Sequence, residues 1–269
     1  MSLSVLISVY AGERPGYLKD ALYSIWENQT YKPAQIVLVK DGPINAELES
    51  EIERYQFKLG EILTVVGLEE NVGLGKALNV GLEYCRHELV ARMDTDDVSL
   101  PNRFEKQIKF MNDNPDISAS SASIDEWDEE FVTKINKRSL PLEPESVAAF
   151  AIRRSPLSHP VVIFRKSVIE SVGGYPELRK AQDYALWSLL ITKGHRLANL
   201  PDTLLNMRSG NGLFARRGFR YFQQEMKLLS YQRKIGFLTN KNYVFNAVIK
   251  FFLRLSPNFI KNWAYKLAR

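Results

Sequence analysis

The run Leu89-Val90-Ala91-Arg92-Met93-Asp94-Thr95-Asp96-Asp97 joins a short apolar segment to three carboxylates within four residues. The apolar half predicts a buried strand, and Pro101 can open a helix shortly afterwards. Three carboxylates this close repel one another unless a cation lies among them, and carboxylate oxygens suit Mg²⁺ or Mn²⁺ better than zinc. Two interpretations stay open from these residues alone: a metal and phosphate site, or an acidic turn that caps the next helix.

Apolar and amphipathic segments alternate around this run. Buried strands are predicted at 3–9, 36–39, 62–66 and 89–93, and helices at 17–28, 46–57 and 75–84. Strands too apolar to face water, alternating with helices, are typical of a mostly parallel sheet covered on both faces. The predicted fold class is therefore α/β, with a central sheet flanked by helices.

The chain beyond residue 101 continues with mixed elements. The pattern predicts helices at 102–112 and 146–153, strands at 117–124, 131–137 and 158–165, a turn at 173–176 and a helix opening at 181–183. The strand at 131–137 is predicted to run antiparallel. No internal repeat or low-complexity linker divides the chain.

Polar residues follow three of the predicted strands. Ser8, Val9 and Tyr10 end the first strand, Asp41 follows the second, and the acidic run at 94–97 follows the fourth. Ligands bind at the carboxyl ends of the strands in open parallel sheets. These residues are therefore expected to converge on one crevice.

Length and composition describe an ordinary globular chain. Its 269 residues, 45% of them hydrophobic, can bury one sizeable core, so one domain with an appended segment is expected. The single cysteine, Cys85, excludes an internal disulfide and a cysteine-based zinc site, which fits a reducing compartment. The N-terminal stretch lacks the basic region of a secretion signal, and no apolar run approaches the roughly 20 residues that span a bilayer. A cytoplasmic location is expected.

The C-terminal segment differs in charge from the rest. Residues 214–269 carry 12 Lys or Arg and one acid, Glu225, and 13 of the 30 aromatic residues, whereas the remainder has 24 basic and 30 acidic residues. Asn246, Lys250 and Arg254 form a polar stripe on an otherwise apolar helix at 242–255, and a second apolar face recurs at 258–269. Such helices suit an anionic membrane surface, but packing on the body or on a second copy also fits 242–255. Nucleic acid is not expected, because the cations edge continuous apolar faces.

Several short motifs occur in an order that resembles one known family. They are Val5-Leu6-Ile7-Ser8-Val9-Tyr10, Gln29-Thr30, Val39-Lys40-Asp41-Gly42, Asn71-Val72-Gly73 with Ala77-Leu78-Asn79, Asp94-Thr95-Asp96-Asp97, and Gly173-Gly174-Tyr175 followed by Gln182-Asp183-Tyr184 and Leu186-Trp187. Over residues 3–210 the chain resembles family 2 glycosyltransferases with the GT-A fold. Within that family it is similar to the bacterial group that builds O-antigen and exopolysaccharide (amylovoran-type) repeat units. The resemblance implies a catalytic domain at 1–213 and a basic helical, membrane-associating segment at 214–269.

The resemblance also implies where a nucleotide-diphosphate sugar binds. In the family's pattern Asp41 accepts a hydrogen bond from a uracil-type base, while Ser8, Val9 and Tyr10 line the base pocket. A carboxylate only accepts hydrogen bonds and uracil offers an imide N–H, which favours UDP, then dTDP, over a guanine nucleotide. Gly73 and Lys76 belong to the loop and helix that follow, although a solvated Lys76 is equally plausible.

The remaining site assignments also come from the resemblance. Asp94 would face the ribose, Asp96 would contact donor and metal, and Asp97 would complete the Mn²⁺ or Mg²⁺ site. Asp183 would take the proton from the acceptor hydroxyl, and an N-cap role for it is compatible with this. Candidates for acceptor or phosphate contacts are His159, Gln182, Trp187 and Arg208, with Arg216 and Arg217 nearby. Residues 207–211 lack the histidine that many GT-A enzymes place on the metal, which leaves Asn211, water or the diphosphate to complete the shell.

The expected function is therefore inverting transfer of a hexose or N-acetylhexosamine to a polyprenyl-diphosphate-linked oligosaccharide, at the inner face of the bacterial cytoplasmic membrane. Two alternatives stay open. One is a haloacid-dehalogenase-like phosphatase, whose Asp-x-Asp motif follows the first strand rather than the fourth. The other is a nucleotide-sugar-binding protein without catalysis. The sequence leaves the donor sugar, the acceptor linkage and a homo-oligomeric state open.

Overall fold

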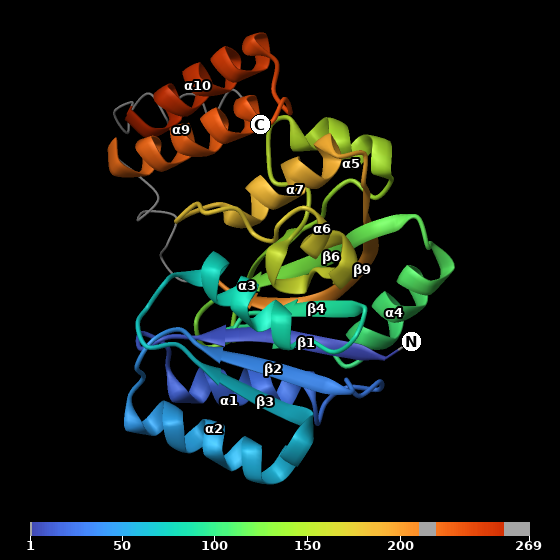
Figure 1. Ribbon diagram of the computed structural model, residues 1–269, viewed down its shortest axis with the longest axis vertical. Coiled ribbons are helices and arrows are strands. Elements are labelled where there is room, and N and C mark those ends of the chain that lie inside the picture. Colours follow the sequence, from blue (N-terminus) through green and yellow to red (C-terminus); the bar gives the residue numbers. More distant parts are fainter. Residues whose placement is uncertain (1, 210–218, 256–269) are drawn as a thin grey trace.

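The computed structural model describes residues 2–209 and 219–255 and shows a sheet with helices on both faces (Figure 1). Four strands and three α-helices alternate along the first part of the chain. They are β1 (Leu3–Val9), α1 (Pro15–Ile25), β2 (Gln35–Lys40), α2 (Ala46–Leu59) with the short 3₁₀ helix Gly60–Ile62, β3 (Leu63–Gly67), α3 (Leu74–Tyr84) and β4 (Leu89–Met93). These seven elements confirm the predicted alternation, with boundaries that differ by a few residues.

The four N-terminal strands form the parallel half of the sheet. β1 lies at its centre and pairs in parallel with both β2 and β4, while β3 extends the sheet beyond β2. The carboxyl ends of β1, β2 and β4 therefore lie side by side at one edge. This is the crevice that the polar residues after these strands predict.

The second half of the sheet is mixed. Its elements are β5 (Val98–Ser99), α4 (Arg103–Asp113), β6 (Ile117–Trp127), β7 (Lys134–Arg138), α5 (Pro144–Ala151), the 3₁₀ helix His159–Val161, β8 (Ile163–Arg165), α6 (Lys166–Ser171), α7 (Gln182–Thr192) and β9 (Arg196–Arg208). β8 joins the two halves by pairing antiparallel with β4 and β6, and β6 pairs in parallel with β9. β7 runs antiparallel to β6, as predicted.

The short elements β5 and α6 were not predicted, and two larger differences from the prediction have a cause in the sequence. The segment predicted as a strand at 158–165 begins as a 3₁₀ helix, and only Ile163–Arg165 is strand. Proline has no N–H to donate to a sheet, so Pro160 disfavours a longer strand. The long strand β9 is absent from the sequence interpretation, because Pro201 and Asp202 interrupt its apolar pattern.

Alternating side chains of the strands build the core on both faces of the sheet. In β1, Leu3, Val5, Ile7 and Val9 belong to one buried cluster, whereas Leu6 belongs to the other. The first cluster includes side chains of α1, α2 and α4, and the second includes side chains of α3 and α7. A rigid, doubly covered sheet thus carries the loops at its carboxyl edge.

Two C-terminal helices, α9 (Phe219–Lys234) and α10 (Asn240–Leu255), form an antiparallel pair beyond α7 (Figure 1). α9 packs on α7 through buried Leu228, beside Tyr184 and Ala185, and Gln232 Nε2 donates to Ser188 Oγ at 2.8 Å. Among the described residues, no helix combines the length and apolar character needed to cross a membrane. The predicted boundary at 213/214 and the predicted helix at 258–269 lie outside the described residues.

Candidate functional site

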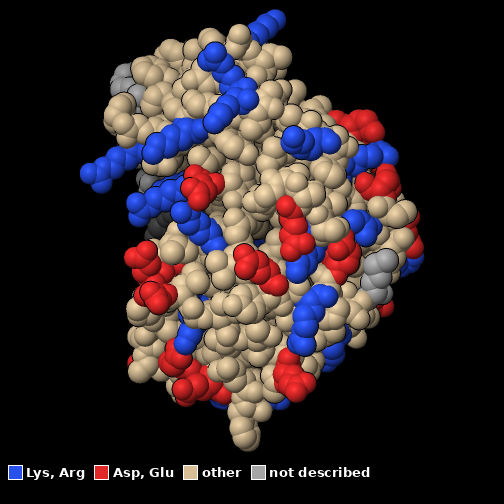
Figure 2. Space-filling view, viewed as in Figure 1, with Lys and Arg blue, Asp and Glu red and all other residues tan. Residues whose placement is uncertain are grey.

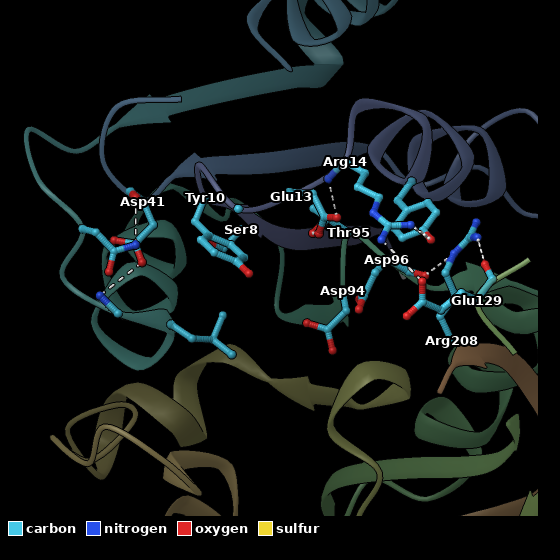
Figure 3. Close-up of a pocket in the computed structure, with 15 residues that line it drawn as sticks. Ser8, Tyr10, Glu13, Arg14, Asp41, Asp94, Thr95, Asp96, Glu129 and Arg208 are labelled. Carbon is cyan, nitrogen blue, oxygen red and sulfur yellow. Dashed lines mark hydrogen bonds and ion pairs between the residues drawn. The ribbon is translucent and has the colours of Figure 1, made fainter. Parts of the chain in front are cut away.

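A pocket of about 580 Å³ opens at the carboxyl edge of the parallel strands (Figure 3). Asp41 and Tyr10 lie at one side of this pocket, Asp94 and Asp96 in the middle, and Glu129 with Arg208 at the other side. The lining residues are Ser8, Tyr10, Gly12, Glu13, Arg14, Tyr17, Asp41, Asn71, Gly73, Leu74, Asp94, Thr95, Asp96, Glu129 and Arg208. The three strand ends expected to converge do so here.

Asp41 is held in a fixed orientation at its side of the pocket. Its carboxylate accepts backbone N–H groups from Val72 at 2.8 Å and Gly73 at 3.1 Å, just before α3 begins. Gly42 lets the two loops meet, because its φ is +85° and a Cβ there would lie 2.6 Å from the backbone nitrogen of Asn71. Each carboxylate oxygen has a second lone pair, so Asp41 can still accept a hydrogen bond from a ligand.

Two buried arginines lie beneath the acidic turn. Arg92 forms an ion pair with Asp94 and also donates to the carbonyl of Met93. Arg103 donates to the carbonyl of Arg92 at 2.6 Å, and burial lowers the pKa of its guanidinium to about 9. Both side chains are fully buried, so their charge partly compensates the carboxylates in a region of low dielectric. The turn is thus built as a charged cluster, which a simple helix cap does not require.

The acidic turn remains electrostatically strained despite these arginines. Burial, Asp94 and Glu13 together raise the pKa of Asp96 to about 6. Burial and the other two carboxylates of the turn raise the pKa of Asp97 well above its ordinary value. Ligand oxygens of Asp94, Asp96 and Asp97 all lie within 4.8 Å of one another. An all-oxygen set of this kind fits Mg²⁺ or Mn²⁺, whose charge would relieve the repulsion.

Arg208, at the end of β9, braces the acidic turn against its neighbours. Its backbone N–H donates to Asp97 Oδ1 at 3.0 Å, and its Nε donates to the carbonyl of Asp96 at 2.8 Å. Its two terminal nitrogens donate to the carbonyl of Glu129 and to Asp20 Oδ2, both at 2.7 Å. The guanidinium also stacks over the ring of Tyr17 at 3.8 Å. Arg208 thus has a structural task beyond the phosphate contact predicted from the sequence, and that contact stays a prediction.

The loop after β1 contributes side chains that the sequence interpretation missed. Glu13 accepts hydrogen bonds from the Thr95 hydroxyl and from the backbone N–H of Arg14. Arg14 reaches Glu129 at 3.4 Å and donates to the Tyr17 hydroxyl at 2.6 Å. Since β1 and β4 are parallel neighbours, the loops after them adjoin. The polar stretch that directly follows the first strand was the signal that could have identified these residues.

Asp183 lies in the first turn of α7, half-buried and outside the residues that line the pocket. Burial raises the pKa of its carboxyl, and the nearby Asp94 raises it further. The start of α7 lies close to the start of α3, because an ideal Cβ on Gly75 would be 3.2 Å from Cγ of Gln182. The glycine permits this approach, which brings Gln182 close to the pocket residues Gly73 and Leu74, while Asp183 lies within electrostatic reach of Asp94.

Four other candidate residues lie away from the pocket lining. His159 is buried and paired with the Tyr175 hydroxyl at 3.0 Å, and burial lowers the pKa of its imidazole well below the ordinary value. Trp187 is fully buried in the core, which argues against its predicted contact with an acceptor or phosphate. The side chain of Val9 also lies in the core, and only its carbonyl points to the site region by accepting the N–H of Asp41. Lys76 forms an exposed ion pair with Glu177 at 3.4 Å.

Asn211, Arg216 and Arg217 lie outside the described residues. The structure therefore brings together Ser8, Tyr10, Asp41, Gly73, Asp94, Asp96 and Arg208 around one pocket, with Asp97 beneath it. Gln182 and Asp183 lie near this group rather than in its lining.

Comparison with solved structures identifies the fold. The structure matches the crystal structure of S. aureus TarS residues 1–349 with a TM-score of 0.67 at 19% identity, covering 96% of this chain and 74% of that one. It also matches the Pyrobaculum calidifontis mannosyltransferase PcManGT, solved with GDP-Man and Mn²⁺, with a TM-score of 0.67 at 19% identity. That match covers 94% of this chain and 70% of the other. The predicted GT-A fold is confirmed.

Comparison of sequences identifies the family. The chain is 39% identical to the amylovoran biosynthesis glycosyltransferase AmsE of Erwinia amylovora, over 99% of this chain and 98% of that protein. It is 33% identical to the Escherichia coli UDP-Gal:alpha-D-GlcNAc-diphosphoundecaprenol beta-1,3-galactosyltransferase, over 98% of this chain and 94% of that protein. The family model described as "Glycosyl transferase family 2" matches residues 4–173. The chain belongs to glycosyl transferase family 2.

Proposed function

We propose that this glycosyltransferase transfers a hexose or N-acetylhexosamine, with inversion, from a UDP-sugar to a lipid-diphosphate-linked oligosaccharide. The observation that carries the proposal is the convergence of Asp41, the acidic turn at 94–97 and nearby Asp183 at one edge of the sheet. These groups match the three needs of the reaction: recognition of the base, neutralisation of the diphosphate and removal of a proton.

Donor recognition rests on the side of the pocket that contains Asp41. Its backbone partners fix the carboxylate in place, and a free lone pair can accept the imide N–H of uracil. Ser8 and Tyr10 flank it, and Tyr10 is half-exposed, so its ring is available to a planar base. The UDP complexes of the structural neighbour TarS are consistent with this choice, although PcManGT carries a guanine nucleotide.

Asp96 and Asp97 would hold Mn²⁺ or Mg²⁺, with Asp94 directed toward the ribose and restrained by Arg92. A bound divalent cation would neutralise the charge that develops on the leaving nucleoside diphosphate. Arg208 would keep the turn in place through its bonds to Asp96 and Asp97. The Mn²⁺ in the PcManGT structure supports the metal assignment by analogy.

Asp183 would act as the general base. The acceptor hydroxyl forms a bond to the anomeric carbon, the bond from that carbon to the diphosphate oxygen breaks, and the hydroxyl proton passes to the Asp183 carboxylate. Burial raises the pKa of this carboxyl, which makes it a stronger base than an exposed aspartate. Attack on the face opposite the diphosphate inverts the anomeric configuration.

The relatives suggest the biological setting. The printed names of two relatives refer to amylovoran biosynthesis and to a diphosphoundecaprenol-linked acceptor. We therefore propose a role in O-antigen, capsule or exopolysaccharide synthesis, at the inner face of the bacterial cytoplasmic membrane. Residues 1–213 would form the catalytic domain and 214–269 a segment for membrane association. The family assignment removes the phosphatase alternative, and the acidic motif follows β4 rather than β1.

A donor screen tests the proposal. The protein is incubated with Mn²⁺, a panel of UDP-, dTDP- and GDP-sugars and a synthetic lipid-diphosphate acceptor, and nucleotide release is measured with and without chelator. We expect release of UDP from one donor, dependent on metal and acceptor, and a product of inverted anomeric configuration. No release with any donor would favour the non-catalytic alternative, and a retained configuration would remove Asp183 from its role.

A further inference from the structure

The helix α10 is oriented with its polar side inward. Asn246 is buried, accepts a hydrogen bond from Arg153 at 2.8 Å and donates to the carbonyl of Ile152 at 2.8 Å. Four and eight residues later, Lys250 and Arg254 both bind Glu225 of α9, at 2.9 Å and 2.8 Å. The polar stripe predicted from the sequence therefore attaches α10 to the rest of the molecule.

The apolar residues of α10 consequently face outward. Seven large side chains of this helix are between 39% and 60% exposed, and they are Val244, Phe245, Val248, Ile249, Phe251, Phe252 and Leu253. A contiguous apolar surface of this kind on a soluble domain usually marks a place where something binds. We call these seven residues the α10 apolar face.

The surroundings of the α10 apolar face are basic. Residues 219–255 contain seven Lys or Arg and one acid, Glu225, whose carboxylate is already bound by two of these cations. The exposed cations are Arg220, Lys227, Arg233, Lys234 and Lys241. In Figure 2 the end of the molecule formed by α9 and α10 is mostly tan, with blue Lys and Arg side chains projecting from it.

We propose that the α10 apolar face and its basic rim dock on an anionic lipid bilayer. The apolar side chains would enter the boundary between headgroups and acyl chains, while the Lys and Arg residues would contact anionic headgroups. The inference deepens the proposed function by naming the surface that brings the enzyme to a membrane, and it rests on that function only for the identity of the lipid-linked acceptor.

Charge favours the bilayer over two other occupants. In a symmetric dimer through α10 the same basic rim would meet itself, with no free acid on α9 or α10 to pair with it. The C-terminal residues 256–269 would also bring like charge onto this face, because they contain Lys261, Lys266 and Arg269 and no acid. An anionic headgroup layer supplies the complementary sign.

Vesicle co-sedimentation of the full chain tests the proposal without any turnover. The vesicles are phosphatidylcholine alone, or equal parts of phosphatidylcholine and phosphatidylglycerol. We expect binding to the anionic vesicles that weakens with salt, and little binding to the neutral ones. The variant Val248→Asp/Phe252→Asp removes two half-exposed apolar side chains and should bind roughly 100-fold more weakly, at about tenfold per side chain. The matched control is Phe57→Asp, which changes a 94% exposed phenylalanine on α2 and should bind like wild type.

Each outcome decides the question. If the charged double variant fails to fold, Val248→Ser/Phe252→Ser probes the same face. Equal binding by the wild type and the folded variant would overturn the proposal. The proposal would also be overturned if light scattering showed a wild-type dimer that does not bind vesicles and that dissociates in the variant. Vesicle binding without donor turnover would overturn only the proposed function, whereas turnover of a water-soluble acceptor without vesicle binding would overturn only this inference.

Discussion

Replacing Arg208 with alanine should destabilise the fold around the acidic turn. The guanidinium makes hydrogen bonds to the carbonyls of Asp96 and Glu129, and each is worth about 1.5 kcal/mol when the donor is charged and the site is partly buried. Stacking on Tyr17 and Phe131 adds about 0.5 kcal/mol per ring, and the half-exposed Asp20 adds no more than about 0.5 kcal/mol. Because the contributions overlap, we expect a loss of about 3–4 kcal/mol in the free energy of unfolding.

Urea unfolding followed by tryptophan fluorescence measures this loss, and calorimetry with Mn²⁺ and UDP measures the site. We expect weaker metal binding as well, since the backbone of Asp96 loses its brace. Arg14→Ala is the matched control: its side chain is 63% exposed, so solvent weakens both its ion pair with Glu129 and its hydrogen bond to the Tyr17 hydroxyl, and the change in stability should stay below about 1 kcal/mol. If Arg208→Ala lowers the free energy of unfolding by less than about 1 kcal/mol but greatly weakens UDP binding, the structural role is refuted and Arg208 contacts the phosphates of the donor instead.

Four further predictions concern other residues of the site and of the C-terminal helices. Asp183→Asn should lower kcat by roughly 10²–10⁴-fold while the Kd for UDP, measured by calorimetry, changes little, because the proposed general base would act only in the transfer step. A parallel loss of UDP affinity would contradict this role. The pKa of Asp96 is raised to about 6, so protons should compete with Mn²⁺ below this pH, and the affinity for Mn²⁺ should rise as the pH increases through 6 and then level off. An Mn²⁺ affinity that stays constant from about pH 5 upward would indicate that Asp96 has an ordinary pKa. Glu225→Gln should lower the free energy of unfolding by about 2 kcal/mol at pH 7. Burial alone would raise the pKa of Glu225, but its bonds to Arg254 and Lys250 lower that pKa overall. The ion pairs therefore stabilise the fold above pH 4.5, the ordinary pKa, and the difference in stability between wild type and variant should shrink as the pH falls below 4.5. A difference in stability that is independent of pH would show that the ion pairs contribute nothing. Gly42→Ala should lower the free energy of unfolding by about 2 kcal/mol, measured by urea unfolding, because φ is +85° and the new Cβ would lie 2.6 Å from the backbone nitrogen of Asn71. An unchanged free energy of unfolding would mean that the two loops can move apart without cost.

Much of the parallel half of the fold could be predicted from the sequence. Strands such as Leu3–Val9 and Leu89–Met93 are short, apolar and separated by amphipathic helices, and the polar residues after them mark the carboxyl edge. Asp41 and Asp96 could be placed at one site on this basis together with the family resemblance. Local pattern is sufficient there because the parallel topology itself brings the strand ends together.

Other features depend on contacts between distant parts of the chain. Arg208 follows Asp97 by more than a hundred residues, and only the unpredicted strand β9 brings it to the turn. Glu13 could have been named from the polar stretch after the first strand, but its partner Thr95 could not, because the local pattern predicts that the strand ends converge without saying which side chains meet. The inward polar stripe of α10 also opposes the usual expectation that a helix buries its apolar side.

The pocket draws its lining from a small part of the chain. Apart from Glu129 and Arg208, every lining residue lies between positions 8 and 96. Asp183 and the helices α7, α9 and α10 come later and add no residue to that lining. The residues proposed to bind the donor are therefore nearly continuous in the sequence, and the proposed base, Asp183, lies in a later part of the chain. Within such an architecture, recombination near residue 100 would exchange most of the pocket lining between relatives in one event, and Arg208 is the main contact that the two exchanged parts would have to match.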